Sequence, residues 1–202
     1  MTKRLKKFTA MILAGLLACF SLTACSDEVE VKPDEPMGPS EILNALKNAS
    51  DYTVTLTDGD DYNITVKKDG ALVYEVQTGS ASWGSNDLEI YYDYSGSATF
   101  KKYVLTNGIW ETTEYNTSEG DNAFYSVKHA LPVSNKNIDT LFNDAYYTST
   151  GTGSYTMNAA GLTLIEEDAV TITSSGMIYT IKVDFWTVTI NFNDTVLTLP
   201  TV

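Results

Sequence analysis

The chain has 202 residues and a formal net charge of −13, from 13 basic and 26 acidic residues. The acidic excess argues against nucleic acid as a partner, because binding to phosphates requires a basic surface. The single histidine, His129, and the two cysteines, Cys19 and Cys25, are too few for a metal site of paired histidines or clustered thiolates.

The first 24 residues have the pattern of a bacterial export signal. Residues 1–7 carry four basic side chains, and residues 8–22 carry no charge. This apolar run is too short for a membrane-spanning helix, which needs roughly 20 apolar residues. The next segment, Leu-Thr-Ala-Cys at 22–25, resembles the lipobox of bacterial lipoproteins. The resemblance implies cleavage before Cys25 and attachment of a diacylglycerol to its sulfur, which anchors the protein to the outer face of a membrane of the cell envelope. The alternative is a short buried helix with two incidental cysteines.

Removal of residues 1–24 would leave Cys25 as the only cysteine, so no intramolecular disulfide is expected. It would also leave nine lysines against 26 acidic residues, which disfavours direct contact of the domain with an anionic membrane surface. Residues 25–39 contain five acids and three prolines, a composition too polar to pack, and are predicted to form an extended tether. We expect a single domain in residues 40–202.

This domain opens with a predicted helix in residues 39–50, where Pro39 and Ser40 mark the start and residues 42–49 form an apolar stripe. After Asp51 the apolar residues recur with a period of two, which indicates antiparallel strands. Asn107-Gly108 between two such runs predicts a hairpin. The strands expected in this half cover residues 52–57, 62–68, 71–77, 87–94, 99–105 and 109–115.

Residues 116–136 show no regular period, and residues 137–147 predict a second short helix. Further strands, separated by turn-forming residues, are expected at 154–158, 162–165, 169–173, 177–184, 186–192 and 195–199. A few helices beside a long series of antiparallel strands indicate the α+β class. We expect a strongly curved antiparallel sheet, a half-barrel of roughly ten strands, with a few helices packed on its concave side.

The order of these elements resembles the LolA-like superfamily of lipoprotein and lipid carriers, which includes the LprG and LppX-type lipoproteins. The shared features are the lipidated tether, the opening helix that leads directly into the first strand, the hairpin at 104–115 and the ending Leu199-Pro200. The resemblance implies that a lipid lies between the concave sheet and the helices. The absence of arginine after Arg4 favours lipid binding over the chaperoning of lipoproteins. Large apolar residues are expected to face the ligand, and the alternative is that they belong to an ordinary core. They are Leu88, Ile90, Tyr92, Tyr94, Trp186, Val188, Ile190 and Phe192.

We therefore expect a non-enzymatic lipoprotein that binds a lipid or another apolar ligand, with no cofactor and no metal. The alternative is an extracellular adhesion or interaction module, in which the tyrosine-rich strand at 90–94 contacts protein or carbohydrate and Tyr91 is exposed outward. An enzyme is a third hypothesis, although the sequence has no Gly-x-Ser-x-Gly or Ser-x-x-Lys motif. His129 is interpreted as a polar loop residue, and catalysis would require it to lie near a carboxylate and a serine.

Overall fold

The structure is a computed structural model that describes residues 36–60, 62–81, 84–85, 87–117, 124–193 and 195–201. The predicted export signal, the predicted lipidation residue Cys25 and residues 26–35 of the predicted tether lie outside the described residues. Within the described part of the chain, no helix is both long enough and apolar enough to span a membrane.

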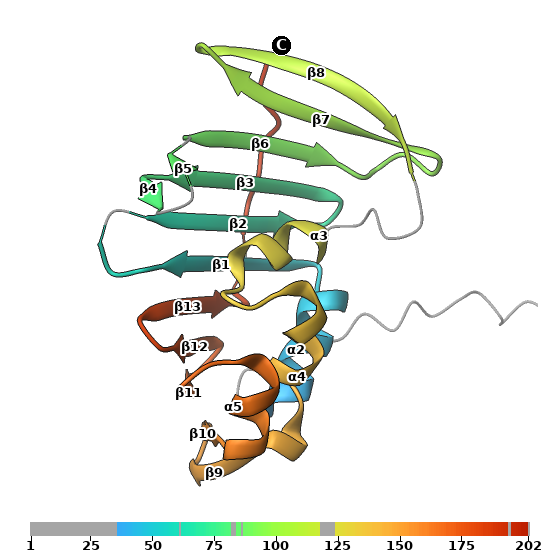
Figure 1. Ribbon diagram of the computed structural model, residues 1–202. Coiled ribbons are helices and arrows are strands. Elements are labelled where there is room, and N and C mark those ends of the chain that lie inside the picture. Colours follow the sequence, from blue (N-terminus) through green and yellow to red (C-terminus); the bar gives the residue numbers. More distant parts are fainter. Residues whose placement is uncertain are drawn as a thin grey trace, which may run out of the picture.

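Eleven antiparallel strands form one open sheet in the order β8-β7-β6-β3-β2-β1-β13-β12-β11-β10-β9 (Figure 1). The antiparallel sheet predicted from the period-two pattern is therefore confirmed. The sheet is partly curled, but it is not the strongly curved half-barrel that was expected. Its strands are β1 (Asp51–Thr57), β2 (Asn63–Asp69), β3 (Leu72–Thr78), β6 (Leu88–Asp93), β7 (Thr99–Thr106), β8 (Ile109–Asn116), β9 (Tyr147–Gly151), β10 (Ser154–Met157), β11 (Val170–Ser175), β12 (Ile178–Val183) and β13 (Trp186–Asn191).

Two meanders, one from each half of the chain, meet at the centre of this sheet. The last strand of the chain, β13, pairs with the first, β1, and their register places Val54 opposite Ile190 and Leu56 opposite Val188. All four side chains are buried. A separate two-stranded pair, β4 (Ser80–Ala81) and β5 (Gly84–Ser85), lies in the connection between β3 and β6. The central pairing therefore joins residues far apart in the sequence into one core.

The helices lie on one face of the sheet, which we call the helix-covered face, and the opposite face is the outer face (Figure 1). The opening helix α2 begins at its predicted proline, and the Glu41 side chain accepts a hydrogen bond of 2.8 Å from the Gly38 backbone. Its stripe buries Ile42 and Leu46 completely or almost so. The helical elements are α2 (Pro39–Asn48), α3 (Phe124–Val127), α4 (Ile138–Leu141) and α5 (Ala159–Ile165), with 3₁₀ turns η1 (Lys128–Ala130), η2 (Asn135–Asn137) and η3 (Asp144–Tyr146).

Two predicted elements between residues 137 and 165 were wrong. Residues 162–165 belong to helix α5, which begins earlier because the Asn158 side chain accepts hydrogen bonds from the backbone of Ala160 and Gly161. Four residues are too few to distinguish a strand from a turn of helix by their period. The helix expected at 137–147 is divided into η2, α4 and η3, and strand β9 follows in a Ser/Thr-rich stretch for which no strand is predicted.

The segment expected as a final strand, residues 195–199, pairs with no strand of the described sheet. It runs across the strands on the outer face instead of along them (Figure 1). Two contacts hold it there: the Thr195 hydroxyl lies 3.2 Å from the Thr53 hydroxyl, and the Leu197 backbone donates to Asp69 at 2.9 Å. The alternation of apolar and polar side chains in residues 195–199 is therefore not caused by pairing within the sheet.

Candidate ligand-binding groove

A groove with a volume of about 960 Å³ lies between the helix-covered face and the segment from Tyr125 to Asn137. It crosses six neighbouring strands, from Lys102 on β7 to Trp186 on β13. The end of α5 closes the side near Trp186 with Ile165, Glu166 and Glu167. The lining is about half apolar and half polar, and its apolar residues from the sheet and from the helical segment include Leu56, Ile64, Leu88, Ile90, Leu131, Pro132, Val133 and Ile165.

Four of the eight predicted ligand-facing residues line this groove, namely Leu88, Ile90, Tyr92 and Trp186. The other four lie on the same face but belong to the packed interior. Val188 and Ile190 are fully buried and Phe192 nearly so, whereas Tyr94 is partly buried and stacks on Tyr92 and Phe100 with ring centroids 6.0 and 5.2 Å away. The periodicity therefore placed all eight residues on the same, helix-covered face, and the helices decide which part of that face stays open.

Glu75 and His129 form a polar pair within the groove. Glu75 lies on β3 between Val66 of β2 and Ile90 of β6, and only 3% of it is exposed. Its Oε1 lies 2.8 Å from Nδ1 of His129, whose side chain is 40% exposed. Hydrogen bonding to Glu75 raises the pKa of His129 above its ordinary value, against the opposing effect of burial. The protonated imidazole is therefore favoured in the folded protein.

Other polar and aromatic side chains surround this pair. The Tyr125 ring meets the His129 ring edge to face, with centroids 5.1 Å apart. Lys102 places its Nζ 5.8 Å from the centre of the Tyr92 ring, and its positive charge lowers the pKa of His129 slightly against the effect of Glu75. Burial, together with the Glu75 charge, raises the pKa of the Tyr92 hydroxyl. This end of the groove thus holds two basic side chains and one carboxylate.

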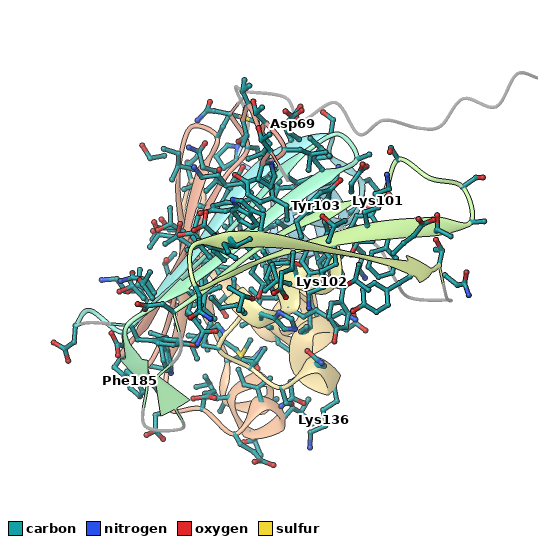
Figure 2. All side chains as sticks on the ribbon, turned by 90° about the horizontal axis from the view of Figure 1, so that it is seen from above. Asp69, Lys101, Lys102, Tyr103, Lys136 and Phe185 are labelled. Carbon is teal, nitrogen blue, oxygen red and sulfur yellow. The ribbon has the colours of Figure 1, made fainter. Side chains whose placement is uncertain are left out.

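Lys102 and its neighbour Lys101 point to opposite faces of the sheet. Lys102 pairs in register with the groove residue Tyr92, whereas Lys101 pairs with Asp93 on the outer face. Figure 2 shows Lys102 on the side of the helices and Lys101 and Tyr103 on the other side. Lys101 is also exposed. The two lysines therefore offer matched positions inside and outside the groove.

The enzyme hypothesis required His129 to lie near both a carboxylate and a serine; the Glu75 carboxylate is hydrogen-bonded to His129, and no described serine is. Ser126 lies one helical turn before His129, but its hydroxyl is fully buried and forms no hydrogen bond with the imidazole. Ser126 is also not among the residues that line the groove. Within the described ranges, no cluster of three His, Cys, Asp or Glu residues could hold a metal ion. The arrangement is suited to binding a polar group beside an apolar one.

The acidic end of the groove gives a pH-dependent prediction. Burial, together with a hydrogen bond to Asp184, raises the pKa of Glu167 from its ordinary value of 4.5 to about 7. The folded state therefore favours the neutral carboxyl, so Glu167 destabilises the protein above about pH 7 and this cost disappears as the pH falls toward its ordinary pKa. We expect Glu167→Gln to raise the melting temperature at about pH 8 and to change it less at about pH 5.

A control for this measurement is Glu114→Gln, which removes the same charge from an exposed position on β8. It should leave the melting temperature nearly unchanged at both pH values. An equal effect of Glu167→Gln at the two pH values would contradict the assignment.

No protein-family model, curated protein sequence or solved structure matches this chain. The function is therefore inferred from the groove and from the chemistry of its lining.

Proposed function

We propose that this protein is a membrane-anchored lipoprotein that binds a lipid or another apolar ligand in the groove and catalyses no reaction. The observation that carries the proposal is the groove itself, about 960 Å³, whose lining combines a continuous set of apolar side chains with polar ones. Sites for small molecules typically measure about 300–1,000 Å³ and combine an apolar wall with a few polar groups. The six strands it crosses are spaced about 4.8 Å apart, so its floor extends over roughly 24 Å. That length suits an extended acyl chain.

The same proposal includes the lipid anchor at Cys25 and the curvature of the sheet. The lipobox at Cys25 attaches the chain to the outer face of an envelope membrane, and the acidic segment between Cys25 and helix α2 tethers the domain close above it. The helix-covered face serves as the concave side of the partly curled sheet, the side on which the resemblance to LolA-like carriers places the lipid. The partly curled sheet with helices on one face supports this arrangement.

The direct test is native mass spectrometry of the full chain carrying Cys25→Ser, purified from bacterial cells. A protein that carries a non-covalent lipid should show a mass higher than its sequence mass, and the difference should be extractable into organic solvent. A clean unliganded mass, together with no uptake of added lipid, would exclude the proposal.

A second candidate function is supported by the outer face. Tyr91 lies there, half-buried between two aromatic rings: the Tyr74 centroid is 4.6 Å away and the Trp110 centroid 5.4 Å away. Partly exposed aromatic rows of this kind suit the apolar faces of sugars or protein side chains. If the protein is an interaction module, Trp110→Ala should weaken binding to its glycan or protein target, measured on a glycan array or by pull-down. An unchanged binding profile would exclude this row as the contact.

A further inference from the structure

Three ionisable side chains gather at one end of the groove. They are Glu75 of β3, Lys102 of β7 and His129 of η1, and all three line the groove. With His129 protonated, this end carries two positive charges and one negative charge. The opposite end, near Trp186, carries the acidic pair Glu166 and Glu167. The groove is therefore electrostatically asymmetric along its length.

Glu75 fixes the orientation of His129. Its carboxylate is buried and binds Nδ1 of the imidazole at 2.8 Å, so Nε2 is the nitrogen left to bind a ligand. The second carboxylate oxygen, Oε2, has no hydrogen-bond partner, but it is also hidden from the groove surface. Of this pair, the groove therefore meets the hydrogen-bond donor His129 and not the carboxylate oxygens of Glu75. Glu75 acts as a positioning residue.

Lys102 provides the second donor. Among the described residues it makes no ion pair with a carboxylate, and its contact is with the face of the Tyr92 ring. A lysine ammonium in a partly desolvated position is stabilised by an anion more strongly than at the surface. Lys136 also lines the groove, from the helical side, and is exposed.

We propose that the groove selects an amphiphile with a single anionic head group, such as a fatty acid. The carboxylate binds between His129 Nε2 and Lys102 Nζ, and the acyl chain extends over Ile90, Ile64 and Leu56 toward Trp186. Glu166 at the far end disfavours the reverse orientation by charge repulsion, and Glu167 adds to this repulsion where it is ionised, above about pH 7. This inference rests on the proposed function, because it names the head group of the ligand that the apolar floor would hold.

The test compares two fluorescent probes of the same chain, cis-parinaric acid and its methyl ester, in buffer without vesicles or detergent. The protein is the full chain carrying Cys25→Ser. We expect the acid to bind about tenfold more tightly than the ester, the size typical of hydrogen bonds to charged groups. Lys102→Met and His129→Gln should each remove most of this difference while the ester still binds. Lys101→Met removes the same charge from the outer face and should change neither affinity.

The outcomes separate the two proposals. Equal affinities for acid and ester, or equal effects of Lys102→Met and Lys101→Met, would overturn the head-group inference and leave apolar binding intact. Binding of neither probe would overturn both proposals. Retained ester binding in Lys102→Met and His129→Gln shows that these variants are folded, so a loss of acid binding in them is specific.

Discussion

Replacing Leu88 by tryptophan should block the groove. Leu88 is partly exposed, lines the groove from the start of β6 and is one of the residues predicted from the sequence to face a ligand. A larger ring at this position occupies the space over the neighbouring strands that the probe would otherwise fill. We expect the affinity for the cis-parinaric methyl ester to fall by about tenfold or more, measured by fluorescence titration.

The matched control is Leu105→Trp. Leu105 is also partly exposed, but on β7 it pairs with Trp110 on the outer face. Its replacement adds the same bulk outside the groove and should leave probe binding unchanged. Equal losses for the two variants, with both proteins folded, would show that the probe does not bind where the groove lies.

Replacing Ile190 by alanine should destabilise the protein strongly, and this effect should not depend on a bound ligand. Ile190 is fully buried at the junction of β13 and β1, where it lies opposite Val54. Truncation of such a side chain leaves a cavity, and the free energy of unfolding should fall by about 2–5 kcal/mol. The measurement is chemical denaturation followed by circular dichroism.

Ile178→Ala is the control for this truncation, since Ile178 on the neighbouring strand β12 is 37% exposed and lies opposite Asn191. It should change the free energy of unfolding by no more than about 1 kcal/mol. If the two truncations had similar effects, Ile190 would not belong to the core. A ligand that contacted Ile190 directly would instead protect the wild type but not the variant against denaturant.

Much of the fold was predictable because its signals are local. Strands such as β1 alternate buried and partly exposed side chains along their whole length, as the period-two pattern requires. The hairpin between β7 and β8 was confirmed at Asn107-Gly108, whose φ angles of 52° and 77° are those that this dipeptide tolerates. The opening helix was confirmed for the same reason, since its starting proline and its apolar stripe lie within ten residues, although its N-cap is Gly38 and not Ser40.

The groove was less predictable, because it depends on contacts between distant parts of the chain. On β3 the alternation is ambiguous: Leu72, Tyr74 and Val76 form the more apolar side, yet it is the side with Val73 and Glu75 that faces the core. The choice is made by the neighbouring strands β2 and β6 and not by β3 itself. His129 lies in a segment without regular period, so its meeting with Glu75, 54 residues away, left no pattern in the sequence.

The most direct measurement places a bound acyl chain relative to two tryptophans. Trp186 lines the groove, Trp110 lies on the outer face, and Trp83 lies outside the described residues. Two variants each keep one described tryptophan, Trp83→Phe with Trp110→Phe and Trp83→Phe with Trp186→Phe, and both are titrated with a brominated fatty acid, which quenches indole fluorescence on contact. Binding in the groove predicts saturable quenching of Trp186 and none of Trp110. Quenching of Trp110 alone, or of neither tryptophan, would contradict the proposal that this groove binds lipid.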